Sequence, residues 1–295
     1  MRVNPNPMPD LLAALNESQL QAQKDLLQIA SGRSVNQPSD NPTSAALLIA
    51  NNDQATFNAG YLQNLTTING TLSTADSTLG SVVTALQRAL TLGVQAANGT
   101  LSDANRAAIA EELKGIQSQL ISLANTSYQG QFIFAGTVTG TAPYTADATD
   151  PSGVTYNGND GVNQVTIGNG YQININLPGS QVFSAASNNV FLAVNQLIQA
   201  VETNTNIDGA VGGISSAATY LSAQRVFYGN AMNQADSQTN YLNTAKLQIA
   251  QQQNTLAGVD LAGVATELSK TQTDAQATLA AIARFGQMNL FDYLK

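Results

Sequence analysis

Side chains able to do acid–base, nucleophilic or redox chemistry are scarce in this sequence. It contains no His and no Cys, so the commonest general base, the commonest metal ligand and any thiolate are absent. No Ser can be activated by a His partner, which excludes the usual hydrolase triad. The remaining candidate bases fall in helical stretches without an apparent pocket: Lys24, Lys114, Lys246 and Lys270. We interpret these lysines as exposed surface side chains.

Three further patterns resemble functional motifs, and each lacks an essential part. Glu111 and Glu112 are adjacent, so their carboxylates splay around a helix instead of forming a pair. The glycine-rich acidic loop 157–161 has neither the alternating ligands nor the distal Glu of a calcium loop. Gly168 and Gly170 belong to a turn, because no helix follows them to complete a phosphate site. The sequence therefore predicts no enzyme, no cofactor and no metal site.

The composition points to packing against other copies of the chain. The net charge is −8 and the basic residues do not cluster, which argues against nucleic acid and against an anionic membrane. Only 10% of residues are charged, well under the usual quarter, so Asn, Gln, Ser, Thr and Ala must form most of the surface. Such a surface has little charge to desolvate when copies meet, and it also suits export through a narrow conduit.

No membrane span or cleavable signal is visible. No window approaches 18 uninterrupted apolar residues. Residues 1–10 contain one Arg, three Pro and no apolar core of the kind that a secretory signal has. If the protein leaves the cell, we expect it to use another route.

A long apolar repeat runs from Leu48 to Ala97, and the rest of the fold must be arranged around it. Steps of three and four residues alternate, which gives a seven-residue period held over several heptads. In its central part the series passes through Leu62, Leu65, Asn69, Leu72, Asp76, Leu79, Val83, Leu86 and Leu90. Residues 39–41 offer helix caps, Pro42 suits the first helical position, and Asn98-Gly99 supplies a stop. A helix over 44–98 would be roughly 80 Å long, which predicts an elongated helical rod.

Shorter heptad repeats begin and end the chain, over residues 8–31 and from Asp260 onward. Isolated helices of this length are marginal in water, so they need one another or neighbouring molecules. We expect them to form a terminal coiled coil, within and between subunits. The apolar residues predicted for this assembly interface are Met8, Leu12, Leu15, Leu26 and Ile29 with Leu261, Leu268, Leu279 and Ile282.

Between these repeats the sequence predicts a helix that has Ser102 as its N-cap and folds back antiparallel onto the long helix. A small β-rich segment and a second long helical stretch follow. Residues 165–177 indicate a β-hairpin with its turn at Gly168–Gly170. Glycines at 209, 212 and 213 suggest that 208–213 is a loop. The predicted fold class is mainly α with a small β insertion. Its expected parts are residues 1–42 (terminal helix and loop), 43–130 and 187–258 (two halves of the rod), 131–186 (β-rich outer insertion) and 259–295 (C-terminal coiled-coil helix).

Four glycines fall inside predicted helices, at Gly60, Gly70, Gly80 and Gly93. Each costs up to about 1 kcal/mol relative to Ala. Close approach of another helix and a local bend are both possible explanations.

Several short motifs give the chain a family resemblance. Residues 31–42 (SGRSVNQPSDNP) resemble a signature of the flagellin superfamily, although Asn41 replaces its usual second Asp. Residues 98–103 (NGTLSD), 123–126 (LANT), 131–136 (QFIFAG) and the final Met288-x-Leu290-Phe291 are similar to the hook-associated protein 3 family, the distal hook–filament junction proteins. The motif residues that we single out are Gly32, Arg33, Asp40, Pro42, Phe132, Phe134 and Gly136. The β insertion is not matched in detail.

The resemblance implies a structural subunit of the bacterial flagellum. Members of this family are exported by the flagellar type III apparatus without a cleaved signal, and a cytoplasmic chaperone guards the C-terminal segment. Their terminal helices line the central channel on assembly, and the junction protein joins hook-associated protein 1 to flagellin in a ring of copies. The resemblance therefore implies an extracellular location on the flagellum.

Three other interpretations stay open at this stage. A filament or minor flagellin shares the motif at 31–42, although the shorter chain and the motif at 132–136 weigh against it. A coiled-coil adaptor or secretion translocator is disfavoured by the 32–42 signature. A glycan-acting enzyme in the insertion is disfavoured because that short segment carries no constellation of ionisable residues.

Overall fold

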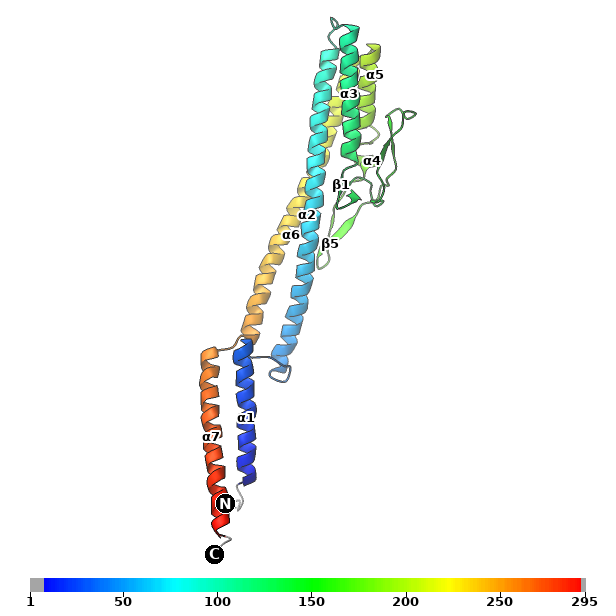
Figure 1. The fold of residues 1–295 in the computed structure, drawn as a ribbon. Helices are drawn as coiled ribbons and strands as arrows, with labels where there is room; N and C mark the ends of the chain where they lie inside the picture. The colour runs from blue at the N-terminus through cyan, green and yellow to red at the C-terminus, as the bar shows by residue number, and fades with distance from the viewer. Residues whose placement is uncertain (1–7, 293–295) are drawn as a thin grey trace. The chain divides into compact units, whose positions relative to one another are not determined.

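The computed structural model describes the backbone of residues 8–292 and the side chains of residues 8–285, and it is mainly helical (Figure 1). The chain divides into two compact units. The terminal unit contains the residues up to Phe57 together with those from Thr244, and the central unit spans Asn58–Asn243. The predicted fold class, mainly α with a small β insertion, is confirmed. The finer division of the chain into five parts stays a prediction.

The terminal unit is built from helices at the two ends of the chain. Helix α1 (Met8–Ser31) lies against helix α7 (Leu261–Asp292), and the two run antiparallel (Figure 1). The unit also holds the first part of α2 (Pro42–Ala96) and the last part of α6 (Ile207–Ala257). A small buried cluster, Val35, Ala45, Leu48 and Ala257, joins the loop after α1 to these two helices.

Helix ends in this unit are set by the residues that the sequence indicated. Gly32 ends α1 in the left-handed conformation, with φ +67°, and its N–H donates to the Gln28 carbonyl at 2.9 Å. Asn41 caps α2, because its side-chain oxygen accepts from the Ser44 N–H at 3.0 Å, and Pro42 follows as the first helical residue. These predicted boundaries are confirmed.

The central unit contains the main hydrophobic core. It holds the rest of α2 and α6 together with α3 (Asp103–Ala124) and α5 (Val190–Thr203), which pack against one another. The predicted N-cap Ser102 is confirmed, since its hydroxyl accepts from the Asn105 N–H at 3.3 Å. The core side chains of α2 recur at steps of three and four along the helix: Leu65, Ile68, Leu72, Ala75, Leu79, Val82, Leu86 and Ala89.

The buried stripe of α2 contains two lines of residues that each repeat every seven positions. One line lies where it was predicted, and the other is shifted by one residue. The predicted line through Leu65, Leu72, Leu79 and Leu86 is buried. The other line passes through Ala75 and its heptad equivalents, not through the predicted Asp76, whose carboxylate instead pairs with Arg225. Counting apolar residues favoured Val83 and Leu90, which are only partly buried.

Within residues 8–292 the β structure consists of three separate two-stranded antiparallel ladders. The first pairs β1 (Ser127–Tyr128) with β2 (Gln131–Phe132), and the second pairs β3 (Tyr144–Ala146) with β4 (Val154–Tyr156). The third pairs β5 (Gln164–Gly168) with β6 (Tyr171–Asn174), which confirms the predicted hairpin, with Gly170 at φ +73° in its turn. A one-turn helix, α4 (Gly179–Val182), follows.

The prediction of a loop over 208–213 is wrong, because α6 already begins at Ile207. Ile207, Ala210 and Ile214 are buried on one face, and this packing outweighs the helix cost of three nearby glycines. A related contact explains Gly93: a Cβ there would lie 2.7 Å from a Val211 methyl group. Close helix approach is therefore the reason for glycine at that position.

Candidate assembly interface

The contact between α1 and α7 is a thin seam of apolar, small and polar side chains. Its positions recur every three or four residues and are at least half-buried. On α1 they are Met8, Leu11, Leu15, Ser18, Ala22, Asp25 and Ile29, and on α7 they are Val264, Leu268, Thr271, Ala275, Thr278 and Ile282. Two of the most buried seam positions, Asp25 and Thr271, are polar. The seam therefore buries little apolar surface, and its hydrophobic stabilisation is small.

The structure divides the predicted interface residues into two groups. Met8, Leu15, Ile29, Leu268 and Ile282 lie on the half-buried stripes. The other four point away from the seam with about half of their surface exposed: Leu12, Leu26, Leu261 and Leu279. Contacts of these outward side chains with another copy stay a prediction.

Asp25 was not singled out by the sequence, because one acid in a polar helix gives no signal. It is 2% exposed, and one carboxylate oxygen accepts a hydrogen bond from the Gln21 amide at 2.9 Å. The other oxygen has no partner among the described residues. The neighbouring Lys24 ammonium lies 3.5 Å from Asp40 instead. A buried carboxylate with one hydrogen bond weakens the seam, because its lost hydration is not replaced.

The loop between α1 and α2 connects three helix ends. The Ser34 N–H donates to the Ala257 carbonyl at 2.7 Å, and the Gln28 amide donates to the Ser34 carbonyl at 3.0 Å. Arg33 forms an isolated antiparallel bridge with Gly258. The motif at 32–42 is thus a joint between the end of α1, the start of α2 and the end of α6.

Asp40 holds this loop in shape. One of its oxygens accepts from the backbone N–H groups of Asn36 and Gln37, each at 3.0 Å, and the other faces Lys24. These hydrogen bonds, with the nearby Lys24 charge, hold the pKa of the Asp40 carboxyl below its usual range. Of the four motif residues in this region, Gly32, Asp40 and Pro42 have local structural roles.

Arg33 differs from them, because its guanidinium has no hydrogen bond or ion pair among the described residues. It borders a groove of about 540 Å³ in the terminal unit. The groove is lined by Gly32, Arg33, Leu48, Ile49, Asn52, Gln253, Asn254, Ala257 and Gly258. It combines one cation with three amides and an apolar floor.

The second motif lies in the central unit and supports its core. Phe134 is buried and meets Phe183 edge to face, with ring centroids 5.0 Å apart. Gly136 has φ +75°, and a Cβ there would collide with the Asn159 backbone. Phe132 is partly buried, and its N–H donates to the Thr139 carbonyl at 2.9 Å. These residues have structural roles within the unit.

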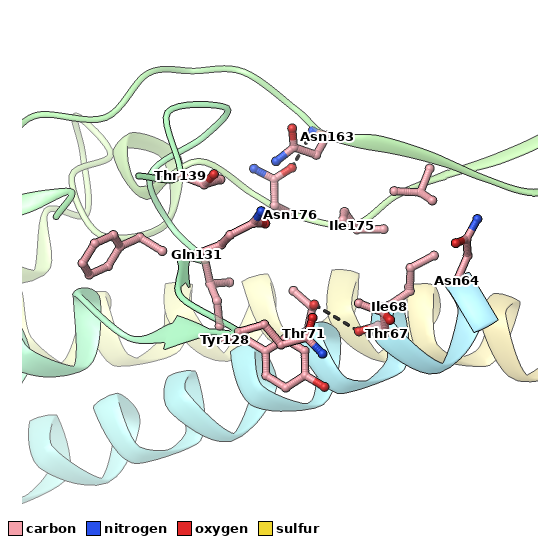
Figure 2. A pocket seen from close by; sticks show the side chains of 14 residues that line it. Asn64, Thr67, Ile68, Thr71, Tyr128, Gln131, Thr139, Asn163, Ile175 and Asn176 are labelled. Atoms are coloured by element: carbon pink, nitrogen blue, oxygen red, sulfur yellow. Dashed lines mark hydrogen bonds between the residues drawn. The ribbon is translucent and has the colours of Figure 1, made fainter. Parts of the chain in front are cut away.

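A cavity of about 280 Å³ lies between α2 and the β structure (Figure 2). Its polar lining consists of amide and hydroxyl groups, for example Asn64, Gln131 and Thr139, and it includes no Asp, Glu, Lys or Arg. The Asn176 side chain accepts from the Asn163 N–H at 2.7 Å beside it. The lining offers no acid–base pair for catalysis.

Ion pairing differs between the units. Each basic side chain of the central unit has a carboxylate partner: Arg88 with Glu112, Arg106 with Asp103, Lys114 with Glu111 and Glu202, and Arg225 with Asp76. In the terminal unit Lys24 and Lys270 are paired. Arg33, Lys246 and Arg284 have no such partner among the described residues.

Metal-ion clusters and membrane-spanning helices are both absent from the described residues. No group of three or more acidic side chains could together hold a metal ion in that part of the chain. No helix within residues 8–292 is both long and apolar enough to cross a membrane.

Comparisons with known proteins cover most of the chain. Residues 7–139 match the bacterial flagellin N-terminal helical region, and residues 211–294 match the bacterial flagellin C-terminal helical region. The chain is 26% identical to flagellar hook-associated protein 3 of Escherichia coli strain K12, over 96% of each protein. It is 32% identical to flagellar hook-associated protein 3 of Salmonella typhimurium, over 60% of this chain and 55% of that protein.

A solved structure shares the fold. The flagellar hook-associated protein-3 of Legionella pneumophila superposes with a TM-score of 0.63 at 15% identity, over 70% of this chain and 98% of that one.

Proposed function

Because this chain belongs to the flagellin family, we propose that it is the structural subunit that joins the flagellar hook to the flagellin filament. Its place is the bacterial flagellum, where its relatives are components. The likeness to hook-associated protein 3 runs over nearly the full length of both proteins, which favours the junction role over other roles in this organelle.

The observation that carries the proposal is the exposed apolar surface of the α1–α7 pair. Leu12, Leu26, Leu261 and Leu279 face outward around a seam that buries little. Large apolar side chains left exposed around a seam that buries little favour contact with another protein surface. We infer that other copies cover these leucines in a ring, so that the terminal pair becomes part of a larger coiled coil.

The proposed partners follow from the junction role. Hook-associated protein 1 would lie on one side of the ring and flagellin on the other, with a cytoplasmic chaperone bound before export. Export by the flagellar type III apparatus to the cell exterior is supported by a chain without Cys, which needs no disulfide to be formed or reduced on the way. We expect no catalytic activity, since the lining of the central cavity carries no acid or base.

The decisive experiment is electron microscopy of flagella from a strain that lacks this gene. A junction protein predicts hooks without filaments, with flagellin shed into the medium, and recovery when the intact gene is returned. A filament or minor flagellin is the second candidate, because the matching helical-region models are those of flagellin itself. Normal or shortened filaments on intact hooks would support it and overturn the junction role.

A single substitution tests whether the outward leucines are the interface. Leu279→Asp places a charge on a side chain that is about half exposed in the single copy, so the free chain should stay folded. In an assembly the same charge would be buried, and filaments should be lost. Gln276→Asp, at an exposed position on the same helix, is the matched control and should assemble normally. Normal assembly of Leu279→Asp would contradict this role.

A further inference from the structure

The groove at Arg33 has the chemistry to recognise a carboxylate. The guanidinium can donate two parallel hydrogen bonds to a carboxylate, and nothing in the described part of the chain uses it. Asn52, Gln253 and Asn254 add amide donors around it, and Leu48 and Ala257 form an apolar floor. The groove therefore suits an acidic side chain that is presented together with apolar neighbours.

The adjoining face of α2 presents this combination, and Ile49 belongs both to this face and to the groove lining. Asp53 lies on α2 between Ile49 and Phe57, which are four residues before and after it and so share one face of the helix. Ile49 is 62% exposed and Phe57 is 63% exposed. The Asp53 carboxylate makes no hydrogen bond or ion pair with another described residue.

Other exposed acids do not match the groove as well. Glu17, Asp208 and Asp274 also lack partners in the described part of the chain. None of them has large exposed apolar side chains on both sides along its helix. Among these carboxylates, Asp53 is the best complement to a cation above an apolar floor.

We propose that the Arg33 groove of one copy receives the Asp53 carboxylate of a second copy, with Ile49 and Phe57 covering the ion pair. This inference rests on the proposed function, and it names a contact between neighbouring subunits. Because these two apolar side chains would exclude water, the ion pair between Arg33 and Asp53 would be stronger than an ion pair at an open surface.

A second copy is the occupant that the charges favour. Each copy carries both the unused cation and the unused carboxylate, so each copy can give one and receive the other. Copies with a net charge of −8 repel one another overall, and an unused cation beside an unused carboxylate offsets this repulsion locally.

Cysteine cross-linking tests the contact, because the natural chain has no Cys. Two singly substituted chains, Asp53→Cys and Asn254→Cys, are produced in one cell, and isolated flagella are oxidised. We expect a cross-linked dimer from the mixture and none from either chain alone. Asp274→Cys mixed with Asn254→Cys is the control and should give no dimer.

Each outcome of the cross-linking has one meaning. If the substituted chains are present in flagella but no dimer forms, the proposed contact is wrong while the junction role stands. A cross-link to a different flagellar protein would also overturn the second-copy assignment. Absence of both chains from flagella that are otherwise normal would instead contradict the proposed function.

Charge reversal gives an independent readout. Arg33→Glu and Asp53→Arg should each lower the fraction of hooks that carry filaments by about tenfold or more, and the double variant should recover to within about twofold of the natural chain. Lys246→Glu combined with Asp53→Arg should not recover. Circular dichroism of each purified variant shows whether it folds. Folded single variants that assemble normally, or a double variant no better than the single ones, would overturn the proposal.

Discussion

The central unit satisfies its own side chains, whereas the terminal unit does not. In the central unit, leucines at every second seam position of α2 are buried and each basic side chain has an acidic partner. In the terminal unit, leucines face outward, Asp25 is buried with a free oxygen, and three cations lack partners among the described residues. The central unit therefore pairs its polar groups and buries its apolar side chains internally. The terminal unit leaves both kinds of group available for contact with another molecule.

The largest effect should come from placing a charge in the core of the central unit. Leu79 is fully buried, and Leu79→Asp should lower the free energy of unfolding by about 4 kcal/mol or more, through lost packing and a desolvated charge. Urea unfolding followed by circular dichroism measures the loss. Leu47→Asp, at an exposed leucine of the same helix in the terminal unit, should change stability by less than about 1 kcal/mol. Equal losses in the two variants would remove the contrast between the units.

Asp25→Leu should act in the opposite direction and stabilise the terminal pair. Replacing a buried carboxylate that has one hydrogen bond with an apolar side chain should contribute about 1–3 kcal/mol. Hydrogen exchange of the α1 and α7 amides should slow accordingly. Glu17→Leu removes the same charge from an exposed position and should leave exchange unchanged. Faster exchange in Asp25→Leu would show that the carboxylate supports the seam.

Breaking the ion pair between Arg225 and Asp76 in the central unit should have a smaller effect. The Arg225 guanidinium donates two hydrogen bonds of 2.8 Å to Asp76, but both side chains are partly exposed. Solvent screening limits the loss in Arg225→Ala to about 1 kcal/mol. Comparing Arg225→Ala, Asp76→Ala and the double variant by urea unfolding isolates the pair. Strictly additive losses would show that the pair contributes nothing.

The smallest effect concerns Asp40 and pH. Hydrogen bonds from Asn36 and Gln37 lower its pKa in the folded protein, so the carboxylate stabilises the loop above the pKa of the unfolded chain. That contribution should be lost as the pH falls below about 4. Exchange of the loop amides in Asp40→Asn should differ from the natural chain at pH 7 and converge with it at lower pH. Asp53→Asn, which lacks these hydrogen bonds, should show no such convergence.

The sequence predicted the features that depend on local chemistry. The caps at Asn41 and Ser102, the stop at Gly32 and the hairpin turn at Gly170 follow from what these residues do to their own backbone. Helix type and length followed from the heptad period.

Features set by distant partners could not be predicted. One line of the α2 seam runs through Ala75 instead of Asp76, and only the position of α6 decides this phase. Helix continues through Gly209 because Ile207, Ala210 and Ile214 find a buried surface far away in the sequence. Asp25 gave no signal for the same reason, since its burial depends on α7.

The loop after α1 also has a mechanical consequence. A tension applied to α1 passes along the chain to Ser34. From there one path runs through the covalent backbone to α2, and a second path runs through the hydrogen bond from Ser34 to Ala257 at the end of α6. The load is therefore shared between α2 and α6 at this level, with the Lys24–Asp40 pair as a further tie. A subunit placed between two rotating parts would transmit torque through α2 and α6 together, because the loop after α1 couples these two helices.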